Sequence, residues 1–346
     1  MERIVAQLTE LQKIELKKEP IRELKADEVL INVKAVGICG SDVSYYKRGT
    51  TGMGMLNFPH VLGHECGGVI VAVGSDVKGY SVGQRVAVEP GVPCGECEYC
   101  REGKYNLCKN LSFMSTAVVR PYGDGAMADH LIRPAKMLHP IPDNVSFEQA
   151  AMIEPLSVGF HAAKIADVKM GQRVAIMGCG PIGGCLLQTM LCCGVSEVYM
   201  TDRNPQKMQI MRELGATEVF DVSGLTEDEL KALLPKDVDV VFDTTCNETL
   251  INSSFHWLRK GGSLVMVGVP AKGMYIDMNA AFVREIAIRT TFRYENTYPQ
   301  AIAMISAGKV APEKLITDRF PLEKADEAMQ LASAKRGDVL KVMLEV

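Results

Sequence analysis

The chain has 346 residues, of which 47% are hydrophobic and 23% charged, and its formal net charge is −4. These values are typical of a globular protein with room for two domains, and the negative charge argues against a nucleic-acid partner. The N-terminus, Met-Glu-Arg-Ile-Val-Ala-Gln-Leu, lacks the apolar core of a secretion signal. The chain has an odd number of cysteines, 11, which favours buried thiols in a reducing cytoplasm over disulfides.

About the first 150 residues contain short β-type runs separated by glycine-containing turns: Glu28–Val36, Gly68–Val73 and Gln84–Val88. Valine, isoleucine and alanine alternate or cluster in these runs between turn signals, as they do in β-strands. We therefore expect a compact β-rich domain at this end of the chain.

Four cysteines follow in one loop with the spacing Cys-x2-Cys-x2-Cys-x7-Cys: Cys94, Cys97, Cys100 and Cys108. Four thiolates complete the tetrahedral coordination of Zn²⁺ and leave no open position, so this spacing predicts a closed, structural zinc site. Two disulfides in a secreted protein are the alternative, and nothing else in the chain is typical of secretion.

A second set of candidate ligands, Cys39, His64 and Glu65, leaves a coordination position free for water or an alcohol oxygen. Zinc in such a site lowers the pKa of a coordinated hydroxyl, and the carbon bearing that oxygen can then pass hydride to a nicotinamide. Ser41, two residues after Cys39, is a candidate for taking the proton, and Glu154 could do so through metal-bound water.

From residue 148 onward the pattern predicts helices alternating with strands. We expect a helix over Glu148–Ala163, broken at Pro155. The remaining predicted strands are Arg173–Met177, Glu197–Thr201, Glu218–Asp221, Val238–Asp243, Ser263–Val267 and Ile286–Thr291, and the intervening helices are Ile182–Cys193, Pro205–Leu214, Glu227–Leu234 and Thr249–Leu258. This alternation predicts a doubly wound parallel sheet, an α/β fold. Two later helices, Tyr298–Ala307 and Leu322–Ala334, precede a β-type end, Leu340–Val346, which we expect to return to the first domain.

The first strand of this region runs into Gly178-Cys-Gly180-Pro-Ile-Gly183 and then an apolar helix. In this context the glycines allow a tight turn, close approach of a pyrophosphate and close helix packing. Asp202 ends the next strand, 24 residues after Gly178, where a carboxylate accepts hydrogen bonds from ribose and repels a 2′-phosphate. NAD is therefore expected rather than NADP, although Arg203, which could bind a 2′-phosphate, follows directly.

The uncharged run Val174–Val195 is interpreted as strand, turn and buried helix, because glycines and a proline interrupt it, and no membrane span is expected.

Several stretches together resemble the zinc-dependent medium-chain dehydrogenase/reductase family, almost end to end, and its polyol branch in particular. These stretches are Gly-Ile-Cys-Gly-Ser-Asp-Val-Ser-Tyr-Tyr (37–46), Val-Leu-Gly-His-Glu (61–65), Arg-Val-Ala-Val-Glu-Pro-Gly (85–91), Ile-Glu-Pro-Leu-Ser-Val-Gly-Phe-His-Ala (153–162), Gly-Pro-Ile-Gly (180–183) and Phe-Arg-Tyr-Glu-Asn-Thr-Tyr-Pro (292–299). The resemblance implies a GroES-like catalytic domain at 1–153 and 292–346, with a zinc lobe at about 90–110, and a Rossmann NAD-binding domain at 154–291.

The resemblance also implies roles for individual residues. Catalytic zinc would be held by Cys39, His64 and Glu65, with Glu154 directly or through water. NAD would contact Gly178, Gly180, Ile182, Gly183, Asp202, Lys207, Val267, Val269, Phe292 and Arg293. The substrate site would include Tyr46, Phe113, Thr116, Arg293 and Tyr294. The family implies a homotetramer or dimer. Ser44 stands where many relatives have a relay histidine, which leaves the proton route open.

We thus expect a zinc enzyme that oxidises a secondary hydroxyl of a polyol such as sorbitol, xylitol or iditol to a ketose, reversibly, with one catalytic and one structural zinc per chain. Other dehydrogenase substrates stay open: 2,3-butanediol, L-threonine, or a sugar-alcohol phosphate bound by Arg120 and Arg293. A noncatalytic NAD-binding sensor or structural protein is an alternative of another class, and it would be expected to have lost its catalytic ligands.

Overall fold

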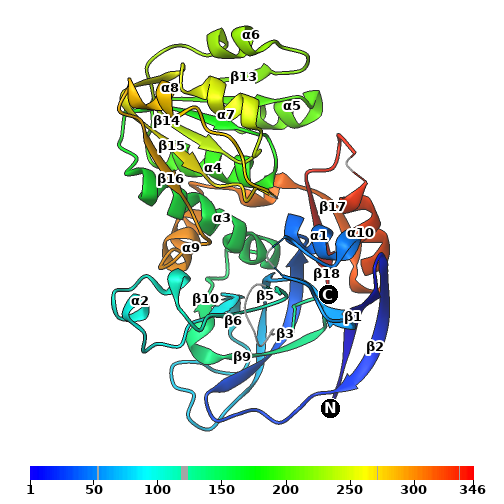
Figure 1. The fold of residues 1–346 in the computed structure, drawn as a ribbon. Coiled ribbons are helices and arrows are strands. Elements are labelled where there is room, and N and C mark those ends of the chain that lie inside the picture. Colours follow the sequence, from blue (N-terminus) through cyan, green and yellow to red (C-terminus); the bar gives the residue numbers. More distant parts are fainter. Residues whose placement is uncertain (53, 118–123, 271, 335) are drawn as a thin grey trace. The chain divides into compact units, whose positions relative to one another are not determined.

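The computed structural model describes residues 1–52, 54–117, 124–270, 272–334 and 336–346. They form two compact units, drawn in Figure 1. Unit 1 comprises Met1–Glu154 and Tyr298–Val346, and unit 2 comprises Pro155–Thr297. The first boundary lies one residue from the predicted position. The second lies at 298 instead of 292, so the segment 292–297 belongs to unit 2.

The main sheet of unit 1 has seven strands. Its order is β10-β6-β5-β3-β18-β17, and β9 pairs with β3. The strands are β3 (Glu28–Gly37), β5 (Glu65–Val73), β6 (Arg85–Val88), β9 (His130–Pro134), β10 (Leu138–Pro140), β17 (Ile316–Pro321) and β18 (Lys341–Glu345). Strand β18 is antiparallel to β3, with Leu344 opposite Val36, so the end of the chain returns to the first domain as expected.

Smaller elements complete unit 1. Strands β1 (Glu2–Glu10), β2 (Lys13–Pro20) and β4 (His60–Val61) form a three-stranded sheet, and β7 (Gly91–Val92) pairs with β8 (Ser112–Phe113). The helices are α1 (Gly40–Arg48), α2 (Glu98–Arg101), α9 (Tyr298–Ser306) and α10 (Ala325–Ser333). The strands β1 and β2 and the helix α1 were not predicted, because charged residues cover most of β2 and glycine begins α1.

Unit 2 is a parallel sheet with strand order β13-β12-β11-β14-β15-β16. The strands are β11 (Arg173–Met177), β12 (Glu197–Asp202), β13 (Glu218–Asp221), β14 (Val238–Asp243), β15 (Leu258–Met266) and β16 (Ala287–Thr290), and the helices are α4 (Pro181–Cys192), α5 (Pro205–Glu213), α6 (Glu227–Ala232), α7 (Glu248–Ser254) and α8 (Met278–Phe282). The predicted doubly wound α/β sheet is confirmed. The order reverses between β11 and β14, which is where such sheets bind ligands.

The helix α3 corrects one prediction. It runs without interruption over Phe147–Ala166 and contains Pro155, where we expected a break. Proline removes one hydrogen bond from a helix and costs about 3 kcal/mol. Apolar burial offsets this cost, because Ile153 and Leu156, on either side of the proline, are fully buried. In the ranges described above, no helix is long and apolar enough to cross a membrane.

Candidate active site

The four cysteines converge in unit 1. Three pairs of sulfur atoms lie at hydrogen-bond-like distances: Cys94–Cys100 at 3.9 Å, Cys97–Cys100 at 3.5 Å and Cys94–Cys108 at 3.5 Å. A tetrahedral Zn²⁺ with bonds of about 2.3 Å requires sulfurs about 3.8 Å apart, whereas a disulfide requires about 2.05 Å. All four thiols are free. The residues therefore fit a structural zinc ion and not two disulfides.

The protein backbone prepares this lobe for a cation. The amide of Glu96 lowers the pKa of the Cys94 thiol, and the amide of Cys100 lowers the pKa of Cys97 to about 6. The thiolate is the form that binds metal. Hydrogen bonds from the backbone therefore favour the thiolate form of Cys94 and Cys97, whereas burial raises the pKa of the Cys100 thiol to about 12.

The second predicted ligand set is also brought together. Cys39 follows β3, while His64 and Glu65 lie at the start of β5, and β3 and β5 are paired antiparallel with Gly37 opposite Glu65. One ligand atom from each of the three residues lies within 4.8 Å of the others. The pairing of two strands thus joins residues 25 positions apart into a site whose thiolate, imidazole and carboxylate suit zinc.

Asp42 joins the two halves of this site, a role that the sequence analysis did not assign. Its carboxylate accepts hydrogen bonds from the amides of Cys39 at 2.9 Å and Gly63 at 3.1 Å. It also accepts one from the Ser115 hydroxyl at 3.3 Å and lies 3.7 Å from Nδ1 of His64. Asp42 has no solvent exposure. The distance between Asp42 and the His64 ring is longer than a hydrogen bond, so Asp42 supports the site by holding the backbone beside Cys39 and His64 and by its charge.

The charges around His64 have a definite effect on its imidazole. Burial alone would lower the pKa of His64, but the negative charges of Asp42, Cys39 and Glu154 outweigh it and raise this pKa well above its ordinary value. Glu154, near the middle of α3, is therefore electrostatically part of the same cluster. Phe113 packs edge-on against His64, with ring centroids 5.8 Å apart. The surroundings of His64 favour positive charge, which a bound cation would supply.

Glu65 has a partner that the sequence did not reveal. Its carboxylate forms a buried ion pair with the ammonium of Lys341, from the C-terminal strand β18. A side chain at Gly37 would lie 2.1 Å from Oε2 of Glu65, so only glycine fits beside this pair. One acidic candidate ligand is thus already paired with a cation, whereas Glu154 offers a second carboxylate.

The predicted proton-relay residues lie on α1. Ser41 is partly buried in its first turn. The hydroxyl of Ser44 donates to the carbonyl of Gly40 and accepts from Arg48, which are contacts of a helix surface. Ser41 therefore stays the candidate that lies beside Cys39.

Two tyrosines of α1 make different contacts. The Tyr46 hydroxyl donates to the carbonyl of Gln12 and to Asp326, so this side chain is committed to contacts within unit 1. Its neighbour Tyr45 instead accepts a hydrogen bond from the amide of Ala117 at 2.9 Å. Thr116 precedes Ala117 and was predicted to bind substrate. We therefore propose Tyr45, in preference to Tyr46, as the tyrosine associated with that segment. Arg120 lies outside the described residues.

The dinucleotide motif has the expected form in unit 2. Gly178 follows β11 with φ of +105°, and a side chain there would meet the Thr244 hydroxyl at 2.5 Å. A side chain at Gly183 would lie 2.0 Å from the carbonyl oxygen of Gly178. Around Gly180 there is open space within 4 Å. Two glycines are thus required by the protein itself, and the third leaves room where a pyrophosphate would approach the start of α4.

Asp202 ends β12 and organises the loop around it. Its carboxylate accepts hydrogen bonds from the amides of Cys179 at 2.6 Å, Arg203 at 2.7 Å and Asn204 at 2.9 Å. Each carboxylate oxygen can accept more than one hydrogen bond, so capacity for ribose hydroxyls is left. Lys207 lies in the first turn of α5, where its amide donates to Asn204.

A cavity of about 390 Å³ lies at this edge of the sheet. Its lining residues come from strand ends, from the segments that follow them and from the helices α6 and α7: Gly178, Thr201, Asp202, Arg203, Val222, Gly224, Leu225, Leu230, Thr245, Asn247, Thr249 and Leu250. Thr245 and Asn247, after β14, were not predicted. The polar run Asp243-Thr-Thr-Cys-Asn directly after a buried strand was the available signal.

The other predicted cofactor residues follow strands of the same sheet. Val267 and Val269 follow β15, and the amide of Val267 donates to Asp243 at the end of β14. Phe292 and Arg293 follow β16, with the Arg293 guanidinium 4.9 Å from the Phe292 ring. Ile182 lies in the first turn of α4, and Tyr294 is buried. The carboxyl ends of parallel strands meet at one edge, so these residues lie on the edge that carries the glycine turn.

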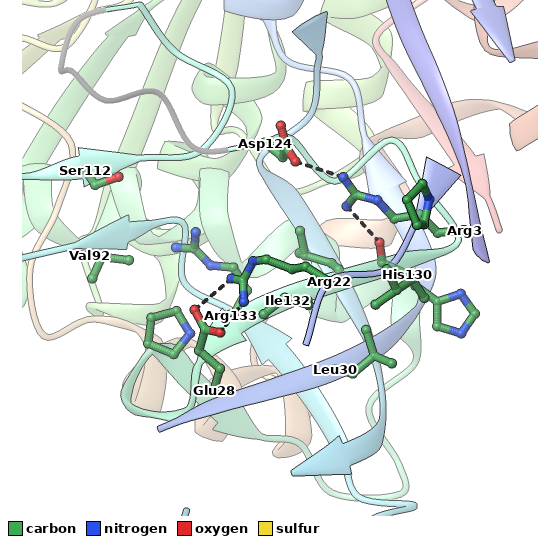
Figure 2. Close-up of a pocket in the computed structure, with 14 residues that line it drawn as sticks. Arg3, Arg22, Glu28, Leu30, Val92, Ser112, Asp124, His130, Ile132 and Arg133 are labelled. Carbon is green, nitrogen blue, oxygen red and sulfur yellow. Dashed lines mark hydrogen bonds and ion pairs between the residues drawn. The ribbon is translucent and has the colours of Figure 1, made fainter. Parts of the chain in front are cut away.

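A further cavity, of about 360 Å³, lies in unit 1 (Figure 2). Its arginines are already engaged. Arg22 forms a bidentate pair with Glu28, Arg3 pairs with Asp124, and buried Arg133 donates to two backbone carbonyls. None of the candidate zinc ligands lines it, so we exclude it from the candidate active site.

Comparison with known proteins agrees with this geometry. Residues 25–143 match the family of the alcohol dehydrogenase GroES-like domain, and residues 181–307 match the zinc-binding dehydrogenase family. The chain is 40% identical to sorbitol dehydrogenase of Bacillus subtilis (strain 168), over 96% of this chain and 94% of that one. It is 37% identical to L-idonate 5-dehydrogenase of Vitis vinifera, over 92% and 88%.

Among solved structures, the crystal structure of L-idonate 5-dehydrogenase from Escherichia coli superimposes with a TM-score of 0.93 and 28% identity, covering 100% of this chain and 99% of that chain. The identity to sorbitol dehydrogenases extends over nearly the whole chain and includes both units. The chain therefore belongs to the zinc-dependent medium-chain dehydrogenase family.

Proposed function

We propose that this protein oxidises a secondary hydroxyl of a free polyol, of the sorbitol, xylitol or iditol type, to a ketose, and that it transfers hydride reversibly to NAD. The observation that carries the proposal is the convergence of Cys39, His64 and Glu65 in a chain 40% identical to a sorbitol dehydrogenase. A noncatalytic protein would be expected to have lost these ligands.

The residues of unit 1 would act on the hydroxyl. Cys39 and His64 would hold zinc together with Glu65 or Glu154, and zinc when bound supplies Lewis-acid activation of the hydroxyl. Asp42 would hold the backbone beside Cys39 and His64 and place a negative charge near the imidazole. The Ser41 hydroxyl, two residues after Cys39, is proposed to take the proton, because it lies in the first turn of the helix that begins beside this ligand.

The residues of unit 2 would bind the cofactor. We propose that the adenosine half of NAD occupies the cavity bounded by Gly178 and Asp202, with the ribose hydroxyls donating to Asp202. The carboxylate disfavours a 2′-phosphate electrostatically. Arg203 lines the same cavity, so the preference is a balance between these two neighbouring charges.

We propose that the polyol is recognised by Phe113, Thr116, Arg293 and Tyr294, with Tyr45 supporting Thr116. Within the described residues the buried Thr116 hydroxyl has no hydrogen-bond partner, which leaves it for a ligand hydroxyl. Fixed polar groups of this kind select a polyhydroxylated chain, because a plain alcohol would leave them without partners.

The test is NADH formation by purified protein with sorbitol, xylitol, ribitol, galactitol, L-idonate, 2,3-butanediol, threonine and a sugar-alcohol phosphate. Turnover of free polyols with NAD supports the proposal. Activity confined to the diol, threonine or phosphate would overturn the substrate assignment and keep the zinc chemistry. Metal analysis is the second arm: two zinc ions per chain are expected, whereas zinc in the cysteine lobe alone would support a noncatalytic NAD-binding protein.

We also propose that the protein is a homo-oligomer, a dimer or tetramer, that associates through unit 2. Strand β16 ends the parallel sheet. Beside it, Met278, Phe282 and Val283 of α8 and its C-terminal end are exposed, Phe282 by 82%. Clustered apolar side chains of this size are typical of an interface, and a second copy would pair the free sheet edge. Phe282→Asp should lower the mass measured by light scattering.

We further propose that the protein acts in a reducing compartment such as the cytoplasm, because its eleven cysteines are free thiols.

A further inference from the structure

The segment from Phe292 to Thr297 has an unusual backbone. Arg293 and Asn296 both have φ of +56°, in the left-handed region that favours glycine. Such conformations cost about 1–3 kcal/mol each and persist only where the surrounding structure imposes them. In this segment Phe292 and Asn296 are exposed, whereas Tyr294, Glu295 and Thr297 are buried. Something must therefore hold the segment in place.

Glu295 is the charged side chain that this segment buries. It is 5% exposed, and its Oε1 lies 2.5 Å from Nζ of Lys164. Its Oε2 lies 2.9 Å from Nδ1 of His161. His161 and Lys164 are three residues apart on α3 and so lie on one face of the helix. The carboxylate thus bridges the segment to a single stretch of α3.

The charge balance makes Lys164 the more important partner. Burial, the larger effect, lowers the pKa of His161, so its imidazole is neutral near pH 7. The ammonium of Lys164 therefore compensates the buried carboxylate, and removing one partner of such a pair leaves an uncompensated charge. The preceding strand is tied to the same stretch, because Arg289 donates to the carbonyl of Ile165 at 3.1 Å.

We propose that Glu295 is a positioning residue for the reaction. Its carboxylate, which Lys164 holds beside His161, keeps the segment in the strained conformation that presents Arg293 and Tyr294. This inference rests on the proposed function, in which those two residues bind the polyol. A purely structural role for Glu295 would lower stability without affecting substrate binding selectively.

Glu295→Gln keeps the shape of the side chain and removes its charge. Lys164→Met removes the ammonium that pairs with Glu295. Because the Lys164 side chain is 60% exposed, this variant should still fold. We expect each variant to raise the KM for polyol about tenfold, since small displacements of a positioning group have large effects. The Kd for NAD should rise by a clearly smaller factor, because Phe292 and Arg293 are only two of the predicted cofactor residues of unit 2. The double variant should be no worse than the single ones, because both remove the same ion pair. Lys164→Arg should restore most of the affinity.

Glu227→Gln is the matched control, because it breaks an exposed ion pair with Lys231 in the same unit. Amide hydrogen exchange tests the positioning without activity: residues 292–297 should lose protection in Glu295→Gln while the strands of unit 2 do not. Unchanged exchange, or parallel changes in polyol KM and NAD affinity, would overturn the inference. If the wild-type protein turns over no polyol, the proposed function fails on its own, and the exchange result still decides whether Glu295 holds the segment.

Discussion

The ammonium of Lys341 and the carboxylate of Glu65 form an ion pair in which the two residues are 2% and 1% exposed. They are 276 positions apart in the chain. Because Glu65 is also a candidate zinc ligand, the C-terminal strand takes part in shaping the metal site.

Replacing Lys341 with methionine should destabilise unit 1 by about 3 kcal/mol, because it leaves a buried carboxylate without its cation. Denaturant unfolding measures this loss. Lys17→Met, which breaks an exposed pair with Glu15, is the control and should change the free energy of unfolding little. Equal effects of the two substitutions would contradict the buried role of Lys341.

Replacing Asp42 with asparagine should weaken zinc binding at the catalytic site about 10- to 100-fold, since outer partners that hold metal ligands in place have effects of this size. Zinc content after dialysis against graded chelator should fall toward one ion per chain, with the four-cysteine site retained. Asp143→Asn, at a fully exposed carboxylate, should behave like the wild type. Loss of both ions together would point to general unfolding instead.

Replacing Asp202 with asparagine should raise the Kd for NAD about tenfold and make NADP a usable cofactor, because a charged acceptor for the ribose is lost. Binding titrations with both cofactors measure the ratio. The comparison is Asp221→Asn at the end of the adjacent strand β13, which should leave that ratio unchanged. A ratio unaffected by Asp202→Asn would mean that Arg203 governs the choice.

Replacing Cys100 with serine should remove the structural zinc and loosen the lobe around α2, because the folding of such a lobe depends on its metal. We expect about one zinc per chain by elemental analysis and faster proteolysis within residues 94–108. Cys193→Ser, a half-buried thiol of unit 2, should retain both ions. Two ions retained in Cys100→Ser would argue against four-cysteine coordination.

The adjacent tyrosines of α1 should respond differently to removal of their hydroxyls. Tyr45→Phe leaves the amide of Ala117 without its acceptor, at a cost of about 1–3 kcal/mol, and should raise the KM for polyol. Tyr46→Phe removes contacts to Gln12 and Asp326 and should lower thermal stability with kinetic constants unchanged. The reverse pattern would restore Tyr46 to the substrate site.

The sequence by itself determined the architecture and the chemical class of the site. The glycine turn, the four-cysteine spacing and the alternation of strands with helices are local patterns, and each depends on residues close together in the chain. Gly178 and Gly183 could be predicted because the turn they form excludes any side chain.

Only the tertiary structure decided which distant residues support that site. Asp42 faces the backbone beside two ligands, Lys341 reaches Glu65 across paired strands, and Glu295 binds α3. Only the tertiary structure also decided which of the adjacent residues Tyr45 and Tyr46 contacts Ala117, because successive side chains on a helix point about 100° apart. Contacts of this kind depend on strand pairing and on helix rotation in the packed protein, which no local spacing in the sequence specifies.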